Sequence, residues 1–439
     1  MTSLPRSSAL QPGVLRREVL GWAMYDFANS GYTTVVLTAV FSAYFVGAVA
    51  GGASWATLAW TSALSLSYLI VMLTTPIMGA WADARAAKKR LLAAVTLLCV
   101  LATASLSWVQ PGDVALAVAL IIVSNVAYSW GETTSYAFLP ELARPEAMGR
   151  VSGWGWGLGY AGGMLTLGLC LAWVLSAQAR GEPASSFVPV TMGITAAMYG
   201  AAALLTFALL KERAQPDAKA LQRGGLRASW QRLRQTWAHA RAFEDFMWLQ
   251  LCTVFYQGGV AVAVALSAVY AEQVIGFEAQ ETMFLIFALN AAAMLGALAF
   301  GYWQDRVGHK LALGVTLLGW ALTCWLAASS QTKGEFWVAA AVAGVCMGTS
   351  QSAGRAMAGL LAPPQRLAEF YGLWGVAAHL ASIIGPMLYG LVNWATGGDH
   401  RLSIMSTMAL FVLAILALLP LNMARGRAAA LHDGEASVA

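Results

Sequence analysis

The chain has 439 residues and a formal net charge of +5, with 26 Lys and Arg against 21 Asp and Glu. Apolar residues make up 59% of it and charged residues only 11%. This balance excludes a soluble globule with a charged surface and indicates a protein that lies in lipid. We expect membrane lipids as partners and no nucleic acid.

Twelve mainly apolar stretches follow one another along the chain, and each is long enough for a helix that crosses a bilayer, which needs about 20 residues. They occupy residues 20–46, 55–82, 91–109, 113–140, 150–177, 188–210, 245–271, 281–303, 311–330, 335–362, 369–396 and 402–423. The first stretch is too long for a cleaved signal peptide and carries Asp26, so we expect it to be retained. The pattern predicts an all-α membrane protein with twelve transmembrane helices.

A short polar motif recurs 222 positions apart, each time between two apolar stretches. Asp83 follows Gly79 by four residues, Asp305 follows Gly301 by four residues, and basic residues come next in both copies. The spacing predicts a tight hairpin after the second stretch and again after the eighth. The chain is therefore expected to contain two copies of one membrane half.

The repeat continues further along the chain, where Gly153 matches Gly372 at an offset of 219. A period of this length predicts two parallel six-helix halves related by an axis along the membrane normal, residues 1–210 and 245–439. Residues 211–244, with eight basic side chains, are expected to form a cytoplasmic linker. We favour an amphipathic piece resting on anionic lipid, around residues 230–237, over a dedicated regulatory site.

The basic residues alternate between loops and thereby predict the orientation. With both termini inside, cytoplasmic segments hold 22 of the 26 Lys and Arg residues, whereas external loops hold only Arg180, Lys333 and Arg401. Positive loops are retained on the cytoplasmic side. Both termini are therefore expected to be cytoplasmic.

Sequence signals of catalysis and of bound metals are missing. The five cysteines all fall in predicted helices without a Cys-x-x-Cys pair, which indicates neither a disulfide frame nor a metal site. No His-Glu-x-x-His motif, glycine-rich phosphate loop or nucleophile elbow is found. We expect no enzyme activity, no cofactor and no metal.

Three ionisable residues fall well inside the apolar stretches. Asp26 is about 9 Å from the cytoplasmic end of its helix, and Glu132 and Arg355 are each about 12 Å inside theirs. A charge at membrane depth costs a few kcal/mol or more and faces a cavity or a partner. The three residues share one depth and form the first candidate for a functional centre.

Several motifs resemble the major facilitator superfamily, beginning with the Gly-x-x-x-Asp hairpins after helices two and eight. Within it, residues 22–30, 136–142, 149–153 and 368–373 resemble the branch related to autophagy-linked vacuolar amino-acid effluxers. The first hairpin departs from the usual pattern, with Ala84 in place of Arg and Ala86 in place of Gly. The fungal members are longer, which favours a bacterial inner-membrane protein.

The resemblance implies a central cavity lined by helices one, four, seven and ten, and a polar lining on those helices. The candidate substrate or proton-coupling residues are Tyr25, Asp26, Asn29, Asn125, Glu132, Tyr136, Tyr256, Gln257 and Arg355. It also implies that Asp83 and Asp305 cap neighbouring helices and release them as the halves rock. The candidate conformational-switch residues are Gly79, Asp83, Gly301, Asp305 and Arg306.

These expectations converge on a monomeric secondary transporter that works by alternating access. It would move a small polar solute, amino-acid-like if two carboxylates and an arginine hold it, coupled to protons through Asp26 or Glu132 and directed toward efflux. The central charges could instead form a cytoplasmic gate, and we slightly favour the site. A drug or metabolite exporter, or a transporter-like sensor or lipid scramblase, is the alternative function.

Overall fold

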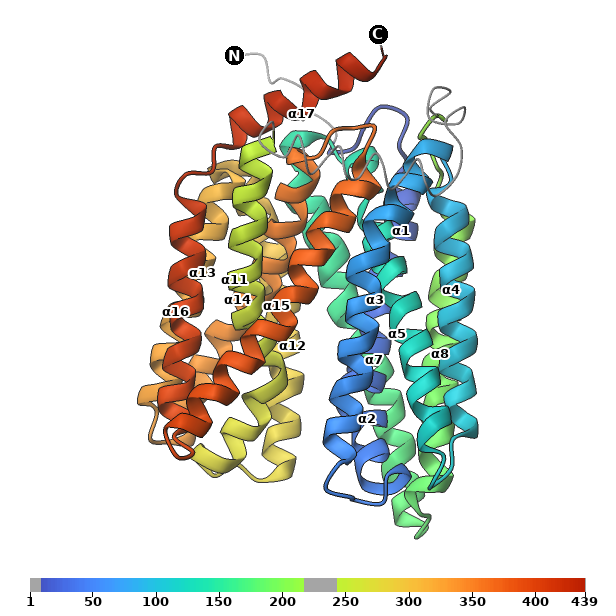
Figure 1. Ribbon diagram of the computed structural model, residues 1–439, viewed down its shortest axis with the longest axis vertical. Helices are drawn as coiled ribbons and strands as arrows, with labels where there is room; N and C mark the ends of the chain where they lie inside the picture. The colour runs from blue at the N-terminus through green and yellow to red at the C-terminus, as the bar shows by residue number, and fades with distance from the viewer. Residues whose placement is uncertain (1–8, 217–242, 439) are drawn as a thin grey trace.

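The computed structural model describes residues 9–216 and 243–438, and almost all of them are helical. They form two bundles that stand side by side, with both ends of the chain at the same end of the molecule (Figure 1). We call this the termini end and the opposite one the far end. The part of the predicted linker around residues 230–237 lies outside the described residues.

Within the described ranges, each bundle contains six long helical segments. The first bundle contains α1 (Arg16–Tyr32), α3 (Ala56–Arg85), α4 (Lys88–Ser105), α5 (Val114–Tyr136), α7 (Met148–Ala179) and α8 (Ala184–Leu209). The second contains α11 (Glu244–Tyr270), α12 (Ala279–Val307), α13 (His309–Ser329), α14 (Lys333–Leu361), α15 (Leu367–Ala395) and α16 (His400–Leu418). After α1 the chain runs on through π-helical turns and α2 (Phe41–Tyr44) to Val49, and α17 (Met423–Val438) lies across the termini end.

Within the described residues, eleven helices are long and apolar enough to cross a membrane. The remaining long helix, α14, has 29 residues and packs against α7, α12 and α13. It is less apolar because its second half carries polar residues, Arg355 among them. The twelve-helix membrane fold predicted from the sequence is confirmed.

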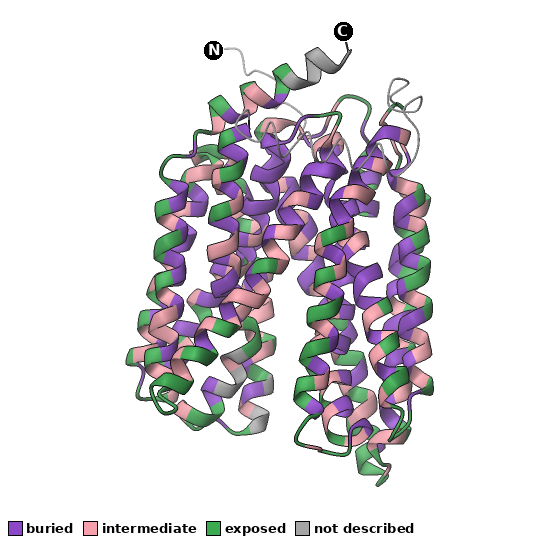
Figure 2. Ribbon diagram, viewed as in Figure 1, coloured by how far each residue is buried: buried purple, intermediate pink, exposed green. Residues whose placement is uncertain are grey.

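The distribution of side chains suits a lipid environment. Exposed residues concentrate on the outer faces of the bundles and buried ones between the helices (Figure 2). Many of the exposed residues are large and apolar, such as Leu69, Leu204 and Leu318. In water they would form a costly apolar surface, whereas lipid tails solvate them.

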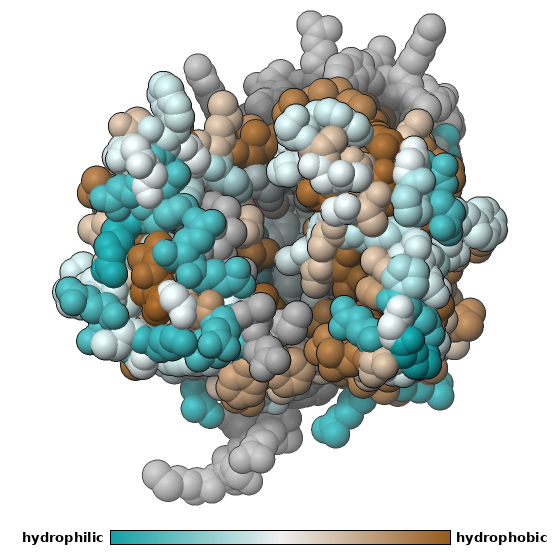
Figure 3. Space-filling view, turned by 90° about the horizontal axis from the view of Figure 1, so that it is seen from below, coloured by the Kyte–Doolittle hydropathy of each residue, from teal (hydrophilic) through white to brown (hydrophobic). Residues whose placement is uncertain are grey.

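The two bundles touch through close helix pairs, α3 with α15 and α7 with α12. Glycines make these approaches possible: a Cβ on Gly79 would collide with the carbonyl of Ala368, and one on Gly153 with the carbonyl of Ala297. Seen from the far end, the surface is hollowed between the bundles (Figure 3). The halves therefore meet toward the termini end and separate toward the far end.

The two hairpins differ at one backbone position. Ala86 ends α3 in the left-handed region with φ +48°, and it is the only non-glycine residue with positive φ among those described. Its counterpart in the second hairpin is Gly308, with φ +95°. A Cβ in the left-handed region costs about 1–2 kcal/mol, so the first hairpin holds strain that the second avoids.

We expect Ala86→Gly to raise the free energy of unfolding by about 0.5–1 kcal/mol, because relief of strain outweighs the extra entropy that glycine gives the unfolded chain. Thermal unfolding of the purified protein in detergent measures this. The reciprocal change Gly308→Ala should lower stability. A loss of stability in Ala86→Gly would contradict the strain assigned to this turn.

Candidate functional site

Arg355 of α14 crosses from the second bundle to the first. Its Nη1 donates to Asp26 Oδ2 of α1 at 2.6 Å, and this contact is an ion pair. Its Nε donates to Ser152 Oγ at 3.0 Å and its Nη2 to the Ser152 carbonyl at 2.6 Å, both on α7. The fully buried guanidinium thus joins three helices from two halves of the chain.

Aromatic rings enclose the same guanidinium. Its Cζ lies 4.7 Å from the ring centre of Trp22, 5.0 Å from that of Tyr136 and 5.3 Å from that of Trp156. Each contact lies within the range of a cation–π attraction. Such rings attract the charge without competing for its hydrogen-bond donors, so they favour Arg355 in this position.

Glu132, predicted at the same depth, forms no ion pair with Arg355. Its Oε1 accepts a 2.7 Å hydrogen bond from the hydroxyl of Tyr128, one turn earlier on α5. Among the described residues no Lys or Arg forms an ion pair with it, and its side chain is partly exposed. The structure therefore joins two of the three predicted charges and leaves the third carboxylate free of a cation.

Other predicted lining residues of the first bundle turn toward their own half. The hydroxyl of Tyr25 lies 3.0 Å from Thr96 Oγ1 of α4. The hydroxyl of Tyr199, on α8, donates to Asn29 Oδ1 at 2.7 Å. Asn125 Nδ2 donates to Ser67 Oγ of α3 at 2.6 Å. These groups join helices within the first bundle.

The predicted residues of the second bundle differ from one another. Gln257 of α11 exchanges two amide hydrogen bonds, of 2.8 and 3.0 Å, with Gln351 of α14. Tyr256 is fully buried, and its hydroxyl has no hydrogen-bond partner within the described part of the chain. Tyr136, from the first bundle, packs against both Tyr371 and Trp374 of α15.

The hairpin carboxylates each reach the first turn of a helix in the opposite bundle. Asp83 Oδ2 accepts from the backbone N–H of Glu369, in the first turn of α15, at 3.0 Å. Asp305 accepts from the backbone N–H groups of Gly149 and Arg150, in the first turn of α7, at 2.8 and 3.3 Å. The switch role assigned to them stays a prediction.

The three other predicted switch residues occupy distinct positions. A Cβ on Gly79 or Gly301 would enter the backbone of the opposite bundle, the latter meeting the Gly149 carbonyl at 2.9 Å. Arg306 is exposed on α12. The glycines therefore let the carboxylates reach their helix ends.

Sequence reasoning missed some contacts of the site. Ser152 accepts hydrogen bonds from two nitrogen atoms of the Arg355 guanidinium. Its hydroxyl also donates to the Ser352 carbonyl at 2.9 Å. The sequence offered one signal for it, since Ser152 lies in the 149–153 motif. Tyr68 of α3 stacks on His379 of α15 at 5.1 Å between ring centres.

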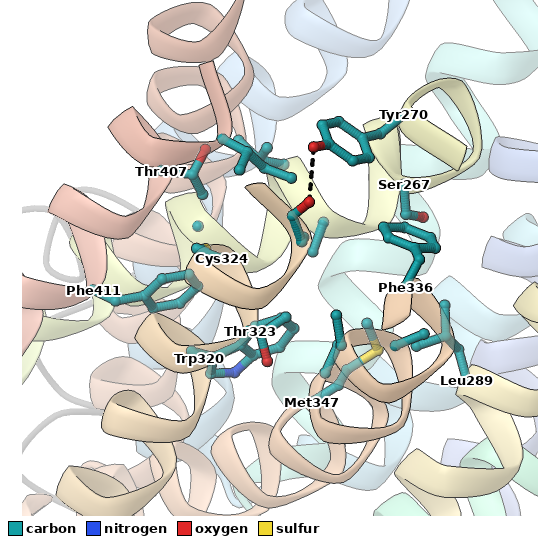
Figure 4. Close-up of a pocket in the computed structure, with 18 of the residues that line it drawn as sticks. Ser267, Tyr270, Leu289, Trp320, Thr323, Cys324, Phe336, Met347, Thr407 and Phe411 are labelled. Atoms are coloured by element: carbon teal, nitrogen blue, oxygen red, sulfur yellow. Dashed lines mark hydrogen bonds between the residues drawn. The ribbon is translucent and has the colours of Figure 1, made fainter. Parts of the chain in front are cut away.

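A separate cavity of about 70 Å³ lies within the second bundle (Figure 4). Its wall is largely apolar and includes Trp320, Phe336, Met347 and Phe411. The hydroxyl of Tyr270 at its edge donates to the Ala327 carbonyl at 2.9 Å. The lining carries no charged residue, so this cavity is distinct from the charged centre between the halves.

Two six-helix bundles joined in this way define a major facilitator transporter, and solved structures share the fold. The human organic anion transporter MFSD10 matches with a TM-score of 0.73 and 15% identity, over 93% of this chain and 100% of that one. The fucose:proton symporter FucP of E. coli matches with a TM-score of 0.69 and 15% identity, over 92% of this chain and 98% of that one.

The chain belongs to the vacuole effluxer Atg22-like family, whose profile matches residues 44–431. It is 28% identical over 404 residues to an uncharacterised MFS-type transporter, YxiO of Bacillus subtilis (strain 168), which covers 90% of this chain and 93% of the relative. A second B. subtilis protein, the uncharacterised MFS-type transporter YqjV, is 24% identical over 136 residues, 31% of this chain and 33% of that protein. The resemblance drawn from the sequence is confirmed.

The carboxylate caps make a local prediction. Asp305→Asn removes the negative charge that the start of α7 attracts. The free energy that stabilises this helix start should fall by about 0.3–1 kcal/mol. Hydrogen exchange followed by mass spectrometry should show the amides of Gly149 and Arg150 exchanging about two- to fivefold faster. The start of α15, capped by Asp83, is the internal control. Equal acceleration at both helix starts would contradict a local cap.

Proposed function

We propose that this protein is a secondary transporter that moves a small polar solute across a bacterial inner membrane by alternating access. In this proposal the described structure is the state closed at the termini end and open at the far end. Transport runs toward efflux and is coupled to protons. The solute is of amino-acid size, and the transporter works as a monomer.

The ion pair between Arg355 and Asp26 carries this proposal. It links the two bundles beside the paired caps of Asp83 and Asp305, so these polar contacts must separate before the termini end can open. Contacts of this kind bias one of two states, which alternating access requires. The hollow at the far end supports the same assignment of state.

The same contacts favour a gate at Arg355 over a substrate site. An ion pair, two contacts with Ser152 and three enclosing rings already occupy the guanidinium. A solute could reach it only by displacing them. We therefore assign Arg355 and Asp26 to the gate, and proton coupling to Glu132, which has no cation partner among the described residues.

Neutralising Arg355 tests the gate. Arg355→Gln leaves Asp26 buried and unpaired. Removing one partner of a buried ion pair costs about 3–5 kcal/mol, so the state closed at the termini end should lose population. Spin labels on cysteines at positions 52 and 397, in far-end loops of the two bundles, should then report a shorter distance by double electron–electron resonance. Gly52 and Gly397 are both exposed.

Two further variants complete this test. Arg355→Gln combined with Asp26→Asn removes both charges and should return part of the population to the wild-type distance. Arg180→Gln, a matched change at an exposed arginine, should leave the distance unchanged. An unchanged distance in Arg355→Gln would refute the gate.

The proposed orientation follows from the loop charges and has its own test. An impermeant thiol reagent added outside intact cells should label single cysteines at Gly52 and Gly181, at the far end, but not at Glu146 and Ala424, at the termini end. All four positions are exposed, whereas the five native cysteines are buried. Labelling of the second pair alone would reverse the orientation.

A further inference from the structure

We propose that Glu132 binds the ammonium group of the transported solute, so that the substrate class is an organic amine cation. The inference rests on the proposed transport function and narrows its substrate. Its starting point is the unequal environment of the two acids, Asp26 and Glu132, that lie at membrane depth. Asp26 forms an ion pair with Arg355, whereas Glu132 forms no ion pair with a Lys or Arg residue in the described part of the chain.

Asp26 is unavailable to a solute in this state. It is almost fully buried, with about 5% of its surface exposed, and Arg355 binds its Oδ2. Glu132 keeps exposed surface. Its Oε1 accepts a hydrogen bond from Tyr128, and Tyr136 is a second hydroxyl neighbour of the carboxylate. A carboxylate has room for several donors, so Glu132 can still accept hydrogen bonds from a cationic ligand.

The support for Glu132 is rigid and aromatic. The ring of Tyr128 stacks on that of Tyr32 at 5.1 Å with an interplanar angle of 24°, and the hydroxyls of Tyr32 and Ser124 lie 2.8 Å apart. These contacts fix the hydroxyl that holds the carboxylate. A carboxylate held among tyrosine rings suits an ammonium group, which gains both a charged hydrogen bond and cation–π attraction.

A stacked pair of rings, one from each bundle, supplies a second aromatic wall. Thr133, next to Glu132, is the nearest neighbour that a Cβ on Gly375 of α15 would meet. His379 lies one turn beyond Gly375 and stacks on Tyr68, whose hydroxyl is close enough to interact with the charge of Glu132. Tyr68 and His379 are both partly exposed. The carboxylate and the stacked pair therefore lie close together where the two bundles meet.

A solute anion has no equivalent partner. Arg355 is the one permanently charged cation at membrane depth among the described residues, and its three kinds of contact already occupy it. The carboxylate of a zwitterion would enter this site without a counter-charge, at a cost of desolvation. The site should therefore prefer an amine to the corresponding amino acid or carboxylic acid.

Ligands that share one ring distinguish a preference for amines from a preference for amino acids or carboxylic acids. Tyramine, tyrosol and 4-hydroxyphenylacetate share one ring and differ in their charged or neutral end group, and tyrosine adds a carboxylate to tyramine. Titration of the purified protein, followed by tryptophan fluorescence, should give tyramine a Kd at least about tenfold lower than that of each other ligand. Tightest binding of the acid or of tyrosine would overturn the inference.

Variants assign the preference to Glu132. Glu132→Gln should raise the Kd of tyramine by about tenfold or more, whereas Glu272→Gln, a matched change at an exposed far-end residue, should leave it unchanged. Tyr128→Phe removes only the hydroxyl that holds the carboxylate, so it should weaken tyramine binding less than Glu132→Gln does. This variant tests the site if Glu132→Gln fails to fold. Equal tyramine affinity in Glu132→Gln and wild type would refute the site.

Failure of this inference is distinguishable from failure of the transport function. If the labels at positions 52 and 397 still respond to Arg355→Gln but tyramine does not bind, the substrate class is wrong and alternating access stands. Proton uptake that depends on Glu132, without amine binding, would likewise overturn the ammonium site and leave a proton site. If the labels never respond, the transport mechanism itself fails.

Discussion

A charge at membrane depth must be neutralised where it stands, and the arrangement of the two halves depends on how Arg355 meets this requirement. Water is absent from the bilayer core, so a buried guanidinium needs its acceptors within reach. Asp26 and the carbonyl and hydroxyl of Ser152 supply them from α1 and α7. Since all of these acceptors belong to the other bundle, satisfying one side chain draws two halves of the chain together on one side of the membrane centre.

Close backbone approach extends the same contact along two helix pairs. Lipid tails are as apolar as leucine, so helices in a bilayer associate through tight packing and polar contacts. Gly79 and Gly301 allow that packing, and the carboxylates four residues later, Asp83 and Asp305, then reach the helix starts of the opposite bundle. One short motif, used twice, thus produces a nearly symmetric seam. Ala86, strained where the other copy has Gly308, is a point at which the symmetry is imperfect.

The sequence predicts the helices and the repeat well, because apolar length and the 222-residue offset are visible along the chain. The depth of a residue in the membrane can also be predicted, since each residue adds 1.5 Å of rise along a helix. This estimate predicted that Asp26 and Arg355 lie at the same depth. Direction around the helix is harder to read: neighbouring residues point about 100° apart, so Tyr25 turns toward α4 while Asp26 meets Arg355. Ser152 lies in one of the family-like motifs, but its role was missed because that role depends on Arg355 of α14, 203 residues later in the chain.

The balance of energies in the proposed gate also explains why its charges would not lock the transporter. A buried ion pair contributes little net stability, because the cost of removing two charges from water nearly offsets their attraction. In the proposed cycle, Arg355 and Asp26 separate together when the termini end opens and water reaches both, so the large cost of a single buried charge is avoided. The free energies of the two states can then remain within a few kcal/mol of each other. A small difference in their affinity for a solute suffices to shift this equilibrium. Glu132, which forms no ion pair within the described residues, is in our proposal the place where a solute exerts that affinity without first breaking the contacts of the gate.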